Sequence, residues 1–342
     1  MRPLRVVLVA AGLVVVLALA GTAYWLFTGG RLHHESGRTT MVLTATGYDK
    51  STVDSAMQVM RKRLSAAGLS DPKVERDLNR IVVSVAGEHV NELVAMAEPG
   101  ALRFRLALAS TADRGSTAGG PPAPDDVRAP AGTAVEVERQ EVIAKLGAVY
   151  AAALKITDPD TLSDTEVQAF EPFSRLTGVE VTALPAEIQY KVPTIGCAQL
   201  AHRPPDAVAD PDQQVVACDK GTIGRTKYLL DKAKVVGSDV REALAGNDPS
   251  SGGWVVQVRF TTAGQSRWTG LTKEAYGNGG ARAVGIVLDN NVLTAPAIRD
   301  VIVGNAVISG SFGRTAARTL ASQLTSGSLP LLFSLSSAGY KP

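Results

Sequence analysis

The chain has few of the residues that usually mark a catalytic or metal site. Among its 342 residues are only 4 histidines and 2 cysteines. None of His33, His34, His89 and His202 stands in a nucleophile or metal-binding motif, and the sequence lacks GxSxG, HExxH and Walker-type patterns. Because nucleophilic catalysis needs a base beside a serine or cysteine, the sequence predicts a protein that is not an enzyme and uses no cofactor or metal.

Charge of one sign and aromatic side chains are also scarce. Lys and Arg total 35 against 33 Asp and Glu, and Arg61-Lys62-Arg63 is the only basic cluster. A nucleic-acid surface needs many cations on one face, so nucleic acid is excluded as a partner. Hydrophobic residues make up 45% and aromatics 5%, which predicts a globular core of Val, Leu, Ala and Ile.

A long apolar run occurs at the N-terminus. Val6 to Phe27 carries no charge and follows Arg2 and Arg5, and about 20 apolar residues span a bilayer. Tyr24 and Trp25 stand near its outer end, where such rings favour the interface. We expect residues 1–28 to form a single-pass transmembrane anchor in the cell membrane, with the N-terminus cytoplasmic and the C-terminal domain extracytoplasmic.

A cleavable signal peptide is the alternative, since Ala18-Leu19-Ala20 fits a cleavage site. The apolar run continues past that site, which favours a retained anchor, and both interpretations export the domain. In an exported chain, the two cysteines Cys197 and Cys218 are expected to form a disulfide. Metal binding there would need more ligands than His202.

The first third of the chain predicts a ferredoxin-like base over residues 29–109. Its elements follow the order strand-helix-strand-strand-helix-strand. The helix opening at Ser51 carries an apolar stripe, and the last strand alternates apolar residues with Arg103 and Arg105. The expected elements are Thr39–Thr46, Ser51–Gly68, Lys73–Asp77, Arg80–Val85, Val90–Ala97 and Leu102–Leu108.

The rest of the chain divides into two parts. Residues 110–226 predict a Pro/Gly-rich linker (Ser110–Thr133), a helix (Val137–Lys155) and a weakly patterned, disulfide-containing insertion. Residues 227–342 predict a second α+β unit. Its expected elements are strands Ala233–Val236, Trp254–Thr261, Ala306–Ser309 and Leu329–Leu335, helices Ser238–Ala245 and Thr262–Tyr276 and one from Thr315, and a hairpin at Val284–Ile298.

The hairpin bends at Asp289-Asn290-Asn291. No second carboxylate flanks Asp289 within a motif, and Asp and Asn are common at turns because they tolerate left-handed backbone, so a turn is favoured over a catalytic site. Pro296 cannot donate to a ladder and predicts a strand end or an edge. An edge strand can accept an extended peptide. Asp289, Asn290, Asn291 and Pro296 are therefore the candidate polypeptide contacts, joined by Trp254 and Trp268 if these are exposed.

Two blocks of sequence resemble the periplasmic domain of the SecD family. The first is VMRKRLSAAGLSDPKVERDLNRIVVSVAG with PGALRFRLAL, within residues 59–108. The second includes WVVQVRFTTAGQSRWTGLT, RAVGIVLDNNVLTAPAI, ISGSF and AARTLASQLTSGSLPLLFSL, within residues 253–335. The resemblance implies that residues 227–342 are a SecD-like head subdomain, movable relative to the base. It also implies translocating polypeptide or Sec translocon subunits as partners.

The chain departs from the family pattern at three places. Ser36-Gly37-Arg38-Thr39-Thr40 stands where the family has Asp-Leu-x-Gly-Gly, and Asp289-Asn290-Asn291 replaces Asp-Gly. The family continues into further membrane helices, so a single-pass protein is expected to lack the proton-driven motor. We therefore expect a non-catalytic accessory in protein export. The alternative is an envelope structural or sensory protein that kept the fold and binds a small ligand or cell-wall component.

Overall fold

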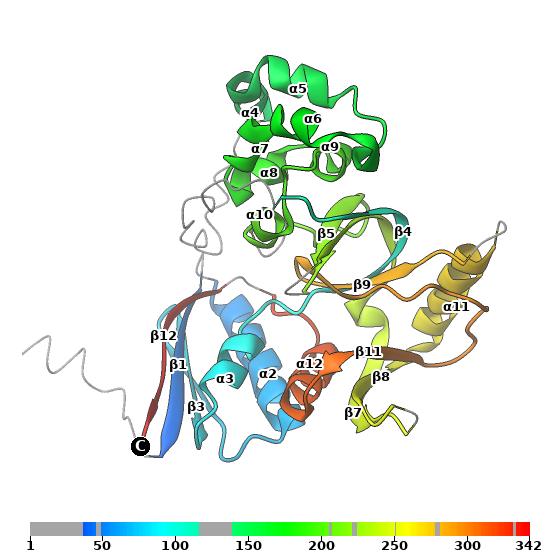
Figure 1. The fold of residues 1–342 in the computed structure, drawn as a ribbon. Helices are drawn as coiled ribbons and strands as arrows, with labels where there is room; N and C mark the ends of the chain where they lie inside the picture. The colour runs from blue at the N-terminus through cyan, green and yellow to red at the C-terminus, as the bar shows by residue number, and fades with distance from the viewer. Residues whose placement is uncertain are drawn as a thin grey trace, which may run out of the picture.

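The computed structural model describes residues 37–45, 49–115, 139–204, 207–220, 224–249, 251–277, 281–330 and 333–342. The predicted anchor at residues 1–28 lies outside these ranges, as does the predicted linker beyond residue 115. Within them, no helix is both long and apolar enough to cross a bilayer. The fold class is α+β, as the sequence predicts (Figure 1).

A four-stranded sheet of order β12-β1-β3-β2, covered on one face by two helices, forms the part that we call the base. All three strand pairs are antiparallel. Apolar residues of β1 and β3, including Leu43 and Val83, pack against Met60 and Leu64 of α2 and Leu93 of α3. The base elements are β1 (Arg38–Ala45), α2 (Lys50–Ala67), β2 (Lys73–Asp77), β3 (Arg80–Ala86), α3 (Val90–Met96) and β12 (Phe333–Lys341).

The sequence correctly predicts a strand at Leu102–Leu108 but places it in the wrong sheet. Leu102–Leu108 does form a strand, β4 (Leu102–Ala112), but this strand pairs with two strands of another sheet. The C-terminal strand β12 instead lies beside β1. Alternation of apolar residues predicts a strand but does not say which edge it joins, and this edge is filled from the far end of the chain.

A closed barrel of order β10-β5-β6-β4-β9 and a three-stranded sheet of order β11-β8-β7 lie beyond the base. We call the second the outer sheet. Phe104, Phe260 and Trp268 meet edge to face or stacked in their common core, with centroids 5.5–5.8 Å apart. The elements are β5 (Val215–Asp219), β6 (Thr226–Val236), η2 (Gly237–Asp239), β7 (Val240–Asn247), β8 (Trp254–Phe260), α11 (Thr262–Tyr276), β9 (Val284–Leu288), β10 (Asn291–Thr294), β11 (Ala306–Phe312) and α12 (Arg314–Ser326).

Short helices between β4 and β5 pack on the barrel side away from the base, and we call them the helical cap (Figure 1). Within the described residues, the single helix predicted at Val137–Lys155 is two helices, Arg139–Leu146 and Ala148–Ala153, divided at Gly147. The sequence signal was weak in the rest of the cap because each helix is only a few residues long. Capping boxes nevertheless begin two of them, at Ser163 with Glu166 and at Thr177 with Glu180. The elements are α4 (Arg139–Leu146), α5 (Ala148–Ala153), η1 (Pro159–Thr161), α6 (Asp164–Gln168), α7 (Glu171–Ser174), α8 (Gly178–Ala183), α9 (Ala186–Lys191) and α10 (Cys197–Ala201).

The helix predicted at Ser238–Ala245 is a strand. The Asp239 carboxylate accepts from the backbone N–H of Val236 at 2.9 Å and binds Arg267, which holds a single 3-10 turn. The chain then runs into β7, which pairs with β8. Two other predictions shift in extent: the helix expected to open at Ser51 is capped by Asp49, and the last strand runs to Lys341.

Candidate functional site at the junction of base, barrel and cap

The turn between β9 and β10 is a two-residue turn at Asp289 and Asn290, since Leu288 pairs with Asn291. Asp289 has a left-handed backbone (φ 52°), as the turn prediction requires. Its carboxylate accepts from the N–H groups of Gly100 at 3.2 Å and Ala101 at 2.9 Å. The turn therefore holds the segment where the chain leaves the base.

Asn290 holds the cap. Its Nδ2 donates to the backbone oxygens of Arg203 at 2.9 Å and Pro204 at 2.8 Å, while its buried Oδ1 has no hydrogen-bond partner among the described residues. Asp289 and Asn290 are only 9% and 6% exposed. The hairpin end is thus not a projecting tip, and both predicted contact side chains are used inside the chain.

The guanidinium group of Arg63 lies in a cage of carbonyl oxygens beneath this turn. Arg63 belongs to α2 and is fully buried. Its Nη1 donates to Met96 and Glu98 at 2.5 Å, and its Nη2 to Pro99 at 2.7 Å and Gly327 at 2.9 Å. These carbonyls come from the end of α3, the turn after it and the end of α12, so one cation joins base and outer-sheet elements.

Burial dominates the electrostatics of the junction. It raises the pKa of Asp289 to about 6, an effect that Glu98 increases and that backbone hydrogen bonds and Arg63 oppose. Burial also lowers the pKa of Arg63 to about 10, against the attraction of Asp289 and Glu98. Arg63 thus stays charged at neutral pH, while Asp289 titrates in the mildly acidic range.

The other candidate contacts lie elsewhere. Asn291 is half-buried at the start of β10, and Pro296 is exposed, two residues beyond the end of that strand. The Pro296 carbonyl accepts from Val284 N at 3.0 Å, so the segment pairs back onto the hairpin. Trp268 is buried in the core, and Trp254 is partly buried beside Arg314.

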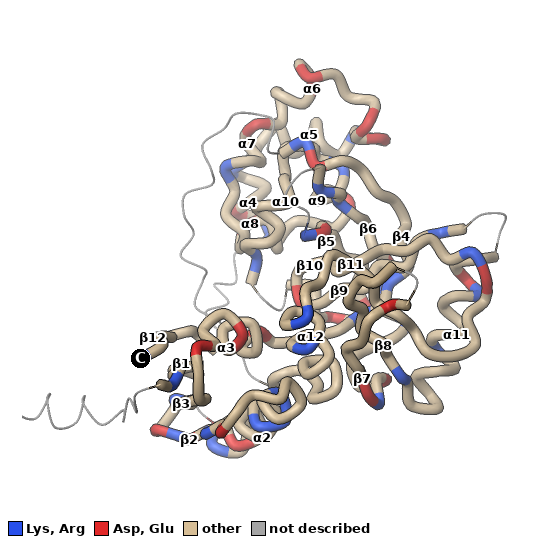
Figure 2. Tube along the Cα trace, turned by 60° about the horizontal axis from the view of Figure 1, so that its bottom comes forward, with Lys and Arg blue, Asp and Glu red and all other residues tan. Residues whose placement is uncertain are grey.

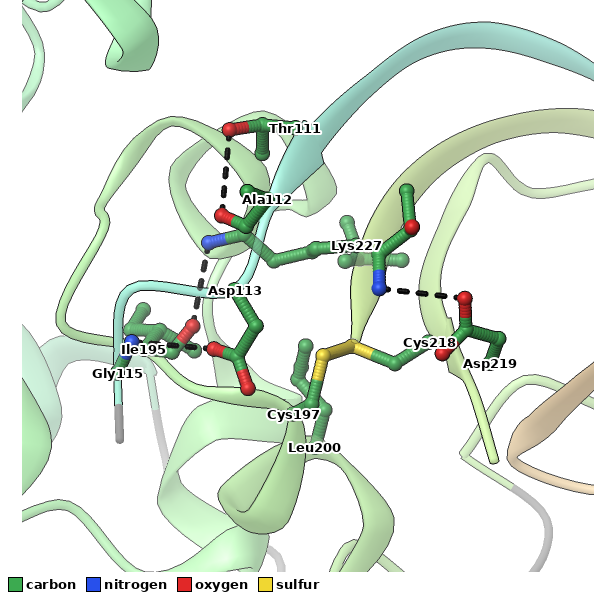
Figure 3. Close-up of a disulfide and its surroundings, with 12 residues drawn as sticks. Thr111, Ala112, Asp113, Gly115, Ile195, Cys197, Leu200, Cys218, Asp219 and Lys227 are labelled. Atoms are coloured by element: carbon green, nitrogen blue, oxygen red, sulfur yellow. Dashed lines mark hydrogen bonds between the residues drawn. A yellow bond between two sulfur atoms is a disulfide. The ribbon is translucent and has the colours of Figure 1, made fainter. Parts of the chain in front are cut away.

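The predicted disulfide between Cys197 and Cys218 is present and joins α10 of the cap to β5 of the barrel (Figure 3). Beside it is an open cavity of about 250 Å³, whose lining includes both cysteines, Asp219, Asn290 and Asn291. This cavity is partly polar and lies between cap and barrel.

Within the described ranges, strand β11 pairs with β8 alone, in the order β11-β8-β7, and the outer sheet does not close. The other side of the β11 backbone is therefore unpaired in this part of the chain. In its exposed row Val307 is 54% exposed, and Val303, shortly before the strand, is 81% exposed. The opposite edge of the sheet, β7, lies against α12, where Thr325 binds Ala243.

Residues 213–331 match the family model of the SecDF P1 head subdomain. The chain carries a SecD head subdomain. The family prediction is thereby confirmed for residues 213–331, which include the outer sheet and every barrel strand except β4, whereas residues 59–108 lie outside this match.

Two curated relatives of the chain are both called protein translocase subunit SecD. That of Streptomyces coelicolor is 40% identical over 129 residues, covering 36% of this chain and 23% of that protein. That of Mycobacterium tuberculosis is 35% identical over 133 residues, covering 38% and 22%. The matched region therefore spans less than a quarter of these relatives.

Among solved structures, the chain is similar to SecDF in its super-membrane-facing form, with a TM-score of 0.48 and 20% identity. The likeness covers 98% of this chain and 35% of that one. A second, described as a membrane component SecDF that enhances protein export, has a TM-score of 0.45 and 19% identity over 87% of this chain and 98% of that one.

Sequence reasoning missed the residues that hold the SecD head to the base. Arg63 could have been found, because it follows Met60 by three positions and precedes Leu64 on the apolar stripe of α2. Arg105 was expected on a polar face, yet it is fully buried. Its Nη2 donates to Asp210 O at 2.6 Å inside the barrel. The carbonyl partners of both arginines carry no sequence signal.

Gly100→Ala tests the cage. Gly100 has φ 74°, and an added Cβ would lie 2.5 Å from Nη2 of Arg63, which its carbonyl partners prevent from moving freely. Gly68→Ala is the matched control, with φ 71° and no neighbour within 4 Å. Left-handed backbone costs each variant about 1 kcal/mol. In urea denaturation, Gly100→Ala should lose about 2 kcal/mol more unfolding free energy than Gly68→Ala, since it disturbs the hydrogen bonds of the charged Arg63 guanidinium. Equal losses would contradict the cage.

Asp289→Asn tests the buried carboxylate. Because its pKa is raised in the folded state, the Asp289 contribution to stability is fully present below its unfolded value and is lost as pH rises through about 6. The loss amounts to about 3 kcal/mol. Relative to wild type, Asp289→Asn should therefore gain unfolding free energy between pH 4 and 7, measured by urea denaturation at each pH. Parallel curves for Asp289→Asn and wild type would refute the assignment.

Proposed function

We propose that this protein is a membrane-anchored, extracytoplasmic accessory of protein export that binds polypeptide without catalysis. The observation that carries the proposal is the match of residues 213–331 to the SecDF P1 head subdomain. The relatives are named subunits of a protein translocase, and one related structure is described as enhancing protein export. By this proposal the partners are translocating polypeptide or Sec translocon subunits.

The proposal that the protein is not catalytic rests on the surroundings of Lys227, whose pKa is strongly shifted. Strongly shifted pKa values are a common mark of an active site. Here burial lowers the pKa of Lys227 to about 7, but its Nζ donates to the carbonyls of Gln189, Val192 and Ile195 in the closed interior. Lys227 is 1% exposed, so it is out of reach of a substrate and serves to join β6 to the cap.

The base supports a role as a platform. Its strand order and helix positions fit a ferredoxin-like unit whose fourth strand comes from the other end of the chain. We propose that barrel, outer sheet and cap are one insertion between α3 and β12. Both chain connections to the inserted part then pass the Arg63 cage, at Pro99 and at Gly327.

The small-ligand alternative is less well supported. A closed apolar pocket between base and head would favour this alternative. The cavity between α2 and α12 is open, and the cavity beside the disulfide is open, partly polar and lies between cap and barrel. Basic and acidic residues are interspersed over the described chain, which suits a neutral polypeptide better than a strongly charged ligand (Figure 2).

The full chain in lipid nanodiscs should bind an unfolded polypeptide in preference to a folded one. The probe is a fluorescent polypeptide made permanently unfolded by reduction and carboxymethylation, and its folded, disulfide-intact form is the control. Fluorescence anisotropy should give at least about tenfold tighter binding of the unfolded form, because an unfolded chain exposes backbone groups along its whole length, whereas a folded one pairs most of its own. Equal affinity for both forms, or no binding of either, would refute the proposed function.

A further inference from the structure

The outward direction of the β11 backbone follows from its neighbours. The N–H and C=O groups of Ala243 in β7 both bind Thr325 of α12, at 2.9 and 3.1 Å, so they point away from β8. Its partner Val258 must then direct its own groups toward β11, where Ala306 lies opposite. Since groups alternate along a strand, Ala306 and Ile308 pair with β8.

Val307 and Ser309 consequently present their N–H and C=O groups to the outside. No residue of the described chain bonds to these four groups. They stand in regular register with Gln257 and Val255, and the register shift occurs only beyond Ser309. The edge therefore offers two donor-acceptor pairs at the spacing of an extended strand.

The other sheet edges are protected, as edges of soluble proteins usually are. On β7, the Thr325 hydroxyl hydrogen-bonds both the N–H and the C=O of Ala243, so these groups are not available to another strand. β2 consists largely of charged residues, with the sequence KVERD. β12 carries a register shift opposite Val42 and Leu43, which leaves Ser336 unpaired in mid-strand.

β11 has none of these defences within its regular stretch. Its sequence, AVISGSF, contains no charge and no proline. Leu244, Gln257 and Val307 form one cross-strand row on the outward face, and Leu244 is 41% and Val307 54% exposed. A further strand beside β11 would extend this row with a side chain next to Val307.

We propose that β11 binds an extended, uncharged polypeptide segment by strand addition at Val307 and Ser309. The inference rests on the proposed function and names its binding mode. Two pairs of backbone groups recognise any extended chain, and Val307 favours an apolar residue opposite it. A folded protein whose strand edges are already paired or covered cannot supply such a strand, nor can a proline at the pairing position.

Ser309→Pro removes one outward N–H and leaves the bonds to β8 intact. Proline is tolerated on edge strands, and the extended backbone of Ile308 suits the position before it. Ser309→Ala is the matched control, since it keeps the N–H. With the same unfolded probe and the full chain in nanodiscs, Ser309→Pro should weaken binding about fivefold, while Ser309→Ala binds like wild type. Val307→Pro, at the second outward N–H, should act alike.

The outcomes separate the two proposals. If wild type fails to bind the unfolded probe, the proposed function itself fails. If wild type binds and both folded proline variants bind equally well, strand addition at β11 is overturned while the function stands. Proline variants that abolish only self-association in sedimentation, with probe binding unchanged, would identify a second copy of the chain as the occupant and also overturn it.

Discussion

The buried guanidinium group of Arg63 is the interaction on which the arrangement of base and head depends. A buried cation without partners is very costly, so its four carbonyl contacts must form together. Those carbonyls belong to both chain connections that leave the base. Asp289 adds a second link by binding Gly100 and Ala101. These buried polar groups therefore help to fix the outer sheet relative to the base, together with the packing of α12 against α2.

Strand addition at β11 is expected to be weak enough to release a polypeptide that moves past it. Four neutral hydrogen bonds at about 1 kcal/mol each give about 4 kcal/mol, which corresponds to a dissociation constant of about 1 mM. An apolar side chain beside Val307 would add a modest amount. Such binding retains a moving polypeptide briefly and releases it.

The local elements were largely predictable, and their partners were not. The apolar stripe of α2, the alternation of β8 and the turn at Asp289 each follow from patterns spanning a few residues. The pairing of β12 with β1 joins chain ends about 300 residues apart, and no local pattern encodes it. The turn residues were correctly identified, but their burial depends on the cap and on Gly100. The free edge of β11 emerged only from the order of the outer sheet.

Residue-resolved amide hydrogen exchange of the full chain, with and without the unfolded polypeptide, tests strand addition most directly. The account predicts that the amides of Val307 and Ser309 exchange fast in the free protein and slow down when the polypeptide is added. The amides of Ala306 and Ile308 should be slow in both conditions, since they bond to β8. Slow exchange at Val307 and Ser309 in the free protein, or no change at saturating polypeptide, would contradict it.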